Sequence, residues 1–195
     1  MCGITGYIGY RQASQVLLEC LKRLEYRGYD SAGICVAGED LSVVKQVGEI
    51  QQLEDVMPDL SGSTGIGHTR WATHGGVTEE NAHPHLSCNG DVAIVHNGII
   101  ENFVALRDEL RENGHAFTSD TDSEIIAHLI EDAYDGSLEK AVRDAVSRLQ
   151  GSYAVVAVSK HEPDRIVAVR RESPLVVGVG DSENFISSDV PAFLE

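Results

Sequence analysis

The 195-residue chain has no long apolar run and little positive charge. It carries 15 lysines and arginines against 31 aspartates and glutamates, which gives a formal net charge of −16 at pH 7. A chain this acidic repels nucleic acid and anionic lipid, so neither nucleic acid nor a membrane is an expected partner. No stretch has the length needed to span a bilayer, and the first residues lack the basic and apolar segments of a signal peptide. We therefore expect a cytoplasmic protein.

Cysteine is scarce, and the usual motifs of several enzyme classes are absent. The four cysteines are widely spaced without a CxxC pair, which predicts neither a disulfide framework nor a zinc knuckle. The chain lacks the GxSxG elbow, the HExxH signature and the phosphate-loop and dinucleotide fingerprints. His83 and His85, with His74 nearby, have a spacing that some zinc sites use. Because no metal signature accompanies them, we expect no metal and no cofactor.

Hydrophobic periodicity predicts an α+β domain. The predicted strands are residues 2–10, 31–37, 41–47, 64–71 and 91–95, followed by an antiparallel meander of 152–159, 164–171 and 174–180. The predicted helices are residues 17–24, 50–57, 100–113, 123–134 and 138–149. No repeat or long linker interrupts this pattern. We therefore expect one domain over residues 1–195, with antiparallel sheets covered by helices.

Cys2 directly follows the initiator methionine. Removal of Met1 would leave a thiol and a free α-amine on one residue. The amine titrates near ~7.7 to 8.0 and the thiol near ~8.5, so the amine can accept the thiol proton close to neutral pH. Nucleophile and general base would then share one Cα atom, as in enzymes with an N-terminal threonine. The alternative is that a small second residue merely permits methionine removal.

Three polar motifs could supply the rest of a site. The run GHTRWATHG contains Arg70, whose guanidinium is suited to holding a carboxylate, although a surface ion pair is the commoner use. The run HNGIIEN contains Asn97 and Gly98, which could form an oxyanion hole or a simple turn. In SDTDSE the acidic and hydroxyl residues suit a helix start, and Asp122 could instead accept a ligand ammonium.

Taken together, these runs resemble the class II glutamine amidotransferases, which are N-terminal-nucleophile glutaminases. The segments CGITGYIG, LEYRGYDSAG, GHTRWATHG, HNGIIEN and TDSEIIAHL stand in the family's order and extend over essentially the whole chain. The resemblance implies an N-terminal-nucleophile hydrolase fold, a four-layer αββα sandwich of two antiparallel sheets covered by helices. It also implies a glutaminase activity.

The resemblance assigns a role to each motif. Cys2 is the implied nucleophile, with its own amine as base, and the Asn97 side chain and Gly98 N–H are the implied oxyanion hole. Arg70 would bind the α-carboxylate of L-glutamine and Asp122 its α-ammonium. The other implied site residues are Trp71 near the ammonia exit, Thr73 and His74 in the pocket wall, and Arg27 as an organiser of the site.

Within the family, YRGYDSAG and THGGVT favour members that pass ammonia to fructose 6-phosphate. The resemblance implies that two C-terminal sugar-isomerase domains follow the glutaminase domain in the full enzyme, and that these 195 residues correspond to the glutaminase domain alone. The resemblance also implies a homodimer for the longer polypeptide. Two alternatives stay open: the glutaminase domain of another class II amidotransferase, and a non-catalytic module that binds glutamine.

Overall fold

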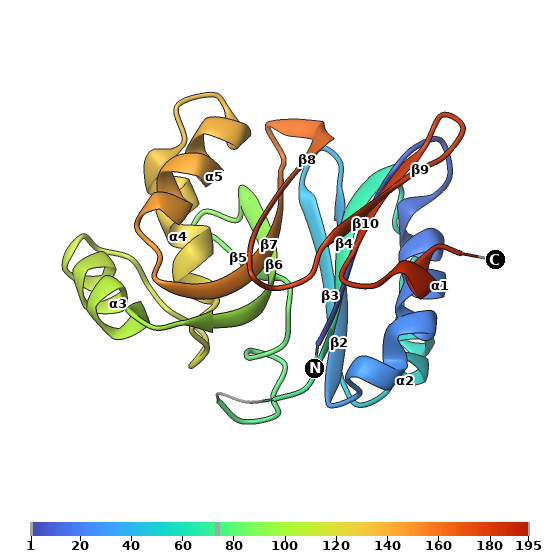
Figure 1. Cartoon of the computed structure of the whole chain (residues 1–195), viewed down its shortest axis with the longest axis horizontal. Helices are drawn as coiled ribbons and strands as arrows, with labels where there is room; N and C mark the ends of the chain where they lie inside the picture. The colour runs from blue at the N-terminus through green and yellow to red at the C-terminus, as the bar shows by residue number, and fades with distance from the viewer. Residues whose placement is uncertain (1, 73–74, 195) are drawn as a thin grey trace.

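The computed structural model describes residues 2–72 and 75–194 of the chain. Two antiparallel sheets lie at the centre, and helices cover the outer face of each (Figure 1). In Figure 1, α3, α4 and α5 lie outside the smaller sheet, and α1 and α2 lie outside the larger one. The expected α+β sandwich of two antiparallel sheets is confirmed.

The elements follow in an order that begins and ends in the larger sheet. The strands are β1 Gly3–Ile8, β2 Ser31–Ala37, β3 Leu41–Val47, β4 Thr64–Arg70, β5 His85–Leu86, β6 Val92–Ile100, β7 Gly151–Ser159, β8 Glu162–Arg171, β9 Val176–Val179 and β10 Asn184–Ser187. The helices are α1 Ala13–Leu24, α2 Ile50–Asp55, α3 Phe103–Glu112, α4 Glu124–Ala133 and α5 Leu138–Ser147, with short 3₁₀ turns at Glu25–Arg27 and Val190–Ala192.

The larger sheet places β1 between a strand from the first half of the chain and one near its end. Its strand order is β3-β2-β4-β1-β10-β9. On one side Gly3 pairs with Thr69 of β4, and on the other Thr5 pairs with Ser187 of β10. Because β1 is enclosed on both sides, the backbone that carries Cys2 is fixed by hydrogen bonds from two partners.

Apolar side chains fill the spaces between the layers. Leu17, Leu21 and Leu24 on α1 are fully buried next to the larger sheet, as their helical spacing predicts. Burial of each such leucine contributes about 1.5–3 kcal/mol. Between the sheets, Ile4 of β1 and Val95 of β6 belong to one buried cluster. This cluster holds together the strand ends that carry Cys2 and Asn97.

The structure differs from the sequence prediction around the Asn-Gly pair. The strand predicted over 91–95 continues as β6 to Ile100, and α3 begins only at Phe103. Asn97 and Gly98 therefore lie inside a paired strand, and the alternative of a simple turn is wrong. The reason is β7, which pairs with β6 along its whole length and overrides the local helical pattern.

The predicted C-terminal meander is also wrong. β7 and β8 do pair, but β9 pairs with β10 in the larger sheet. The chain changes sheets after β8, where Glu172 adopts a φ of 68° and Pro174 cannot donate a ladder hydrogen bond. β5 and β10 have only 2 and 4 residues, too few for a periodic signal.

In the described part of the chain, no helix is both long and apolar enough to cross a membrane.

Candidate active site

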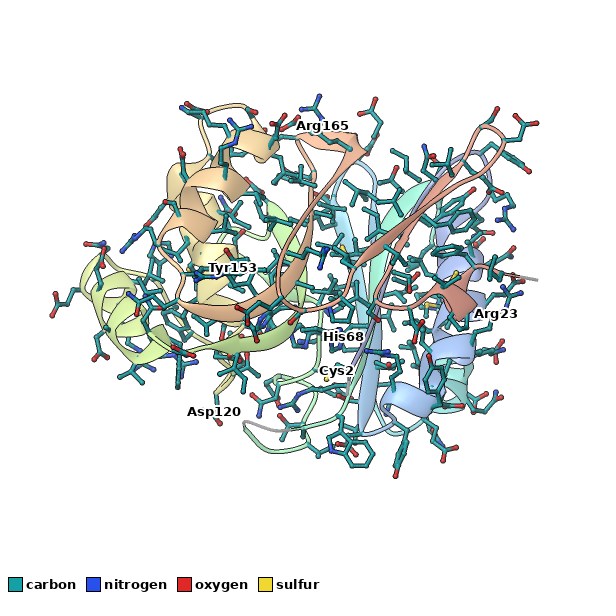
Figure 2. The ribbon with its side chains drawn as sticks, viewed as in Figure 1. Cys2, Arg23, His68, Asp120, Tyr153 and Arg165 are labelled. Atoms are coloured by element: carbon teal, nitrogen blue, oxygen red, sulfur yellow. The ribbon has the colours of Figure 1, made fainter. Side chains whose placement is uncertain are left out.

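Cys2 lies just before β1, where the larger sheet faces the smaller one (Figure 2). Its thiol donates to the Trp71 carbonyl oxygen at 3.5 Å and accepts from the Trp71 N–H at 3.2 Å. Burial raises the pKa of the Cys2 thiol. The thiol is therefore protonated at neutral pH, and a nearby base must remove its proton before it can act as a nucleophile.

Asn97 is held from both ends of its amide. Its Nδ2 donates to the Cys2 carbonyl oxygen at 3.1 Å, and its Oδ1 lies 2.9 Å from Nε2 of His68. Burial lowers the pKa of His68 to about 3, so its ring is neutral and donates through Nε2 to the amide oxygen. Figure 2 labels Cys2 and His68 near each other between the two layers. The His68 contact thus turns the NH₂ group of Asn97 towards Cys2.

Gly98 is required by the close approach of two strands. Its φ is 128°, in a region that favours glycine, and an added Cβ would lie 2.0 Å from the Ser152 carbonyl oxygen of β7. Since that atom belongs to the backbone, the clash could not be relieved by a side-chain rotation. Because residue 98 is glycine, β6 can pair closely with β7 while Asn97 and Gly98 both line the cavities at Cys2.

Arg27 binds the backbone of the candidate nucleophile from the other side. Its Nε donates to the Cys2 carbonyl oxygen at 3.0 Å, and its Nη1 donates to Asp189 Oδ2 at 3.0 Å. The Tyr26 hydroxyl donates to the same Asp189 oxygen at 2.6 Å. The Cys2 carbonyl is therefore held by two donors, the Arg27 guanidinium and the Asn97 amide.

Arg70 and Asp122 bring opposite charges to one cavity beside Cys2. They are 4% and 6% exposed, and both line this cavity. Nη1 of Arg70 donates to the Gly76 carbonyl oxygen at 3.0 Å, and Oδ2 of Asp122 accepts the Ile100 N–H at 2.8 Å. Burial lowers the pKa of Arg70, but a guanidinium stays charged in proteins. A buried cation and anion in one cavity suit the two charged ends of a free amino acid.

Three further predicted site residues follow Arg70 in sequence. Trp71 is 44% exposed, and its ring makes an edge-to-face contact with Tyr29 at 5.2 Å between centroids. Trp71 also lines both cavities that contain Cys2. Thr73 and His74 lie outside the described residues.

Two cavities meet at Cys2 and Asn97. The inner cavity, with Arg70 and Asp122, has a volume of about 40 Å³, and the outer one, with Arg27 and Trp71, has about 280 Å³. A water needs roughly 10–15 Å³ of such volume, so the inner cavity has room for only a few waters. Its walls must move apart to admit an amino acid.

The inner cavity borders a group of four buried histidines. The ring centroids of His68 and His83 are 4.1 Å apart, and those of His83 and His85 are 4.5 Å apart. Burial lowers the pKa of these three residues and of His96, so all four are neutral at pH 7. His74, the third histidine of the alternative zinc site at His83 and His85, lies outside the described residues.

Because these four histidines are buried in their neutral form, we expect mild acid to destabilise the folded protein. Below the ordinary histidine pKa of about 6.5 the unfolded chain binds protons that the folded chain excludes, so the free energy of unfolding falls as pH falls. For His68, whose folded pKa is about 3, the loss at pH 5.5 is about 1.4 kcal/mol. Urea unfolding at pH 7.5 and pH 5.5 measures this loss of unfolding free energy. In the His68→Gln variant, the free energy of unfolding should depend less on pH. An unchanged pH dependence in that variant would contradict the assignment.

Sequence reasoning missed two parts of this site. His68 stands inside the GHTRWATHG motif, but only the tertiary structure brings its ring to Asn97. Asp189 belongs to the chain's last segment, where no periodic pattern marks it, and it reaches Arg27 because β10 pairs with β1. Both residues act on the site through contacts between distant segments.

The chain was compared with known proteins. The family model described as "Glutamine amidotransferase domain" matches residues 68–195. Glutamine–fructose-6-phosphate aminotransferase [isomerizing] of Thermococcus kodakarensis is 54% identical over 200 residues, covering all of this chain and 33% of that protein. The enzyme of the same name from Symbiobacterium thermophilum is 55% identical, and the match covers 100% of this chain and 32% of that protein. The chain thus spans about a third of the length of these curated relatives.

Solved structures agree with the sequence matches. A glutamine phosphoribosylpyrophosphate amidotransferase from B. subtilis superposes with a TM-score of 0.86 at 28% identity, covering 98% of this chain and 43% of that one. A structure titled as the allosteric regulatory enzyme of purine biosynthesis gives a TM-score of 0.88 at 29% identity, with the same coverage. The expected resemblance is confirmed over the whole fold. The chain belongs to the glutamine amidotransferase domain family.

Proposed function

We propose that this chain hydrolyses the side-chain amide of L-glutamine to glutamate and ammonia, with Cys2 as the nucleophile. The observation that carries the proposal is the meeting of the Cys2 thiol, the Asn97 amide and the charged pair Arg70 and Asp122 around one cavity. Family membership supports the same reaction.

The first half of the proposed reaction forms a thioester. Once Met1 is removed, the α-amine of Cys2 takes the thiol proton, and the thiolate attacks the side-chain carbonyl carbon of glutamine. The oxygen of that carbonyl becomes an oxyanion, stabilised by the Asn97 NH₂ group and the Gly98 N–H. The carbon–nitrogen bond then breaks, and the proton held by the amine leaves with the departing nitrogen as ammonia.

The second half releases glutamate. Water gives a proton to the same amine and attacks the γ-glutamyl thioester through a second oxyanion at the same donors. The carbon–sulfur bond breaks, and the thiolate regains its proton. Throughout both halves, Arg70 and Asp122 hold the α-carboxylate and α-ammonium, so that free glutamine is chosen over glutamine inside a peptide.

Direct assays test this proposal. We expect chain that lacks Met1, as verified by intact mass, to release glutamate and ammonia in equal amounts from glutamine. Hydroxylamine should intercept the thioester and yield γ-glutamyl hydroxamate. Binding of glutamine without either product would instead favour the non-catalytic module.

His68 is proposed to act through Asn97 as a positioning residue. We expect His68→Ala to lower kcat by up to about 100-fold with little change in KM, because the amide can rotate away from the oxyanion. The Asn97→Ala variant provides the control: adding His68→Ala to it should have no further effect on kcat. Additive losses in the double variant would mean that His68 acts by another route.

The destination of the ammonia is a further part of the proposal. The names of the relatives, and the chain's span of about a third of their length, support transfer to fructose 6-phosphate by sugar-isomerase domains in a longer polypeptide. The resemblance extends this proposal to a cytoplasmic homodimer. The gene sequence beyond Glu195 tests it: sugar-isomerase domains are expected there, and a phosphoribosyltransferase domain would refute the proposed acceptor.

A further inference from the structure

A second cluster of reactive side chains lies away from Cys2, on the outer side of the smaller sheet. It joins Cys88 in the turn between β5 and β6, His115 in the connection after α3, and His128 and Glu131 on α4. One ligand atom from each residue lies within 4.8 Å of the other three. The proposed glutaminase reaction uses none of these residues, although His128 lies within the TDSEIIAHL segment.

Within the cluster, the Cys88 thiol is within sulfur–nitrogen hydrogen-bond distance of both imidazoles, but the Glu131 carboxylate lies too far from them for ordinary hydrogen bonds. Cys88 Sγ lies 3.4 Å from Nδ1 of His115 and 3.5 Å from Nδ1 of His128. Oε2 of Glu131 lies 3.4 Å and 3.6 Å from the same two nitrogens. Nitrogen–oxygen hydrogen bonds are about 2.7–3.2 Å long, so the carboxylate and the imidazoles are too far apart to satisfy one another.

The same distances do fit a shared ion. In tetrahedral zinc sites the zinc–sulfur distance is about 2.3 Å, and the zinc–nitrogen and zinc–oxygen distances are about 2.0–2.2 Å. Tetrahedral angles then separate the ligand atoms by about 3.3–3.7 Å. We propose that Cys88, His115, His128 and Glu131 bind one zinc ion in a closed, four-coordinate structural site.

The surroundings orient each ligand. Behind His115, Nε2 lies 2.8 Å from Oδ1 of Asp132, which leaves Nδ1 facing the cluster. Behind His128, which is 1% exposed, Nε2 lacks a hydrogen-bond partner and its nearest carboxylate is Glu124 at 3.7 Å. A carboxylate hydrogen-bonded behind the imidazole, as Asp132 is behind His115, is the usual second layer of a histidine metal site, whereas the contact of Glu124 with His128 is longer than a hydrogen bond.

Glu131 is fixed in the same way. Its Oε2 accepts the Cys88 N–H and its Oε1 accepts the Asn89 N–H, both at 3.0 Å. The turn that carries the thiol is therefore bound to the carboxylate of α4 before any ion arrives. His128 and Glu131 are three positions apart on α4, so they share one face of the helix.

The donor set and the access route favour zinc. A thiolate with two imidazoles suits Zn²⁺, whereas Mg²⁺ and Ca²⁺ prefer oxygen ligands only. A cavity of about 440 Å³, lined by Cys88 and His128 among others, opens beside the cluster and gives an ion a path to it. Binding would release the Cys88 thiol proton to solvent and connect the β5–β6 turn, the segment after α3 and α4 through one centre.

Metal analysis tests the site. After zinc loading and removal of free metal, we expect about one zinc per chain by plasma mass spectrometry. With Co²⁺ in place of zinc, a thiolate-to-cobalt charge-transfer band should appear. Cys88→Ser and His115→Ala should abolish both signals, and Asp132→Asn, at an exposed position behind His115, should weaken zinc binding by about 10- to 100-fold.

Matched controls separate this site from the other thiols and histidines. Cys20→Ala and His161→Gln should retain the zinc, and so should Cys2→Ala, whose wild-type thiol and α-amine could themselves chelate a metal. Wild-type chain should also lose thermal stability on chelation and regain it when zinc is restored, a result independent of how the variants fold. Zinc content no higher in wild type than in Cys88→Ser, or content that follows Cys2, would overturn the proposal.

Discussion

Replacement of Cys2 by alanine is expected to lower glutamine hydrolysis by at least about 10⁴-fold, because the variant has no atom that can form the thioester. The measurement is glutamate release from chain whose intact mass shows the loss of Met1. Glutamine binding should survive in the variant, since Arg70 and Asp122 remain in the cavity. Calorimetric titration of the variant with glutamine checks that part.

Two comparisons make the Cys2 result specific. Cys20→Ala removes a thiol buried on α1, outside the cavities at Cys2, and should leave hydrolysis unchanged. Wild-type chain that retains Met1 keeps the thiol but has an amide in place of the free amine, and it should be nearly inactive. Full activity in unprocessed chain would show that another group serves as the base.

Replacement of Arg70 by alanine is expected to raise the KM for glutamine steeply. Loss of one member of a buried charge pair costs about 2–5 kcal/mol, which corresponds to a roughly 30- to 5,000-fold loss in kcat/KM. The α-carboxylate would enter the cavity without its cation, whereas the Cys2 thiol and Asn97 would remain. Steady-state kinetics should therefore place most of the loss in KM.

A substrate analogue separates recognition from a merely structural effect. γ-Aminobutyramide is glutamine without its α-carboxylate, so wild type should strongly prefer glutamine over it. The Arg70→Ala variant should lose that preference. A general distortion of the site would instead lower kcat/KM for both substrates by the same factor. Asp122→Ala is the matched control. Because Arg70 remains in this variant, it should still prefer glutamine over γ-aminobutyramide.

The local parts of the fold were predictable from the sequence, and the parts that depend on pairing were not. β2 and β3 have the predicted bounds because alternating and compact apolar runs mark them directly. The register of β6 with β7 is a long-range property, and it places Asn97 and Gly98 in a strand where local preference suggested a turn. The transfer of β9 to the other sheet likewise depends on a partner that no local pattern names.

The candidate site divides in the same way. Its proposed glutaminase residues were named from motifs that resemble a family, whereas His68 and Asp189 are recognised only from contacts across the fold. The proposed zinc site was not predicted from the sequence, because its four residues, which extend from Cys88 to Glu131, do not follow the spacing of a known metal-binding motif. Only the i, i+3 pair on α4 gave a local hint, and many helices carry such a pair.

The pairing of β1 with β10 has a consequence for the timing of assembly. A ribosome makes the strand behind Cys2 first and β10 last among the described strands, and the Ile4 N–H binds Ser188 across 184 residues of sequence. Until those final residues emerge, one edge of β1 has no partner, and Arg27 lacks Asp189. A chain that ends before β10 therefore lacks these contacts behind Cys2, and the proposed hydrolysis of glutamine requires nearly the whole domain to be synthesised.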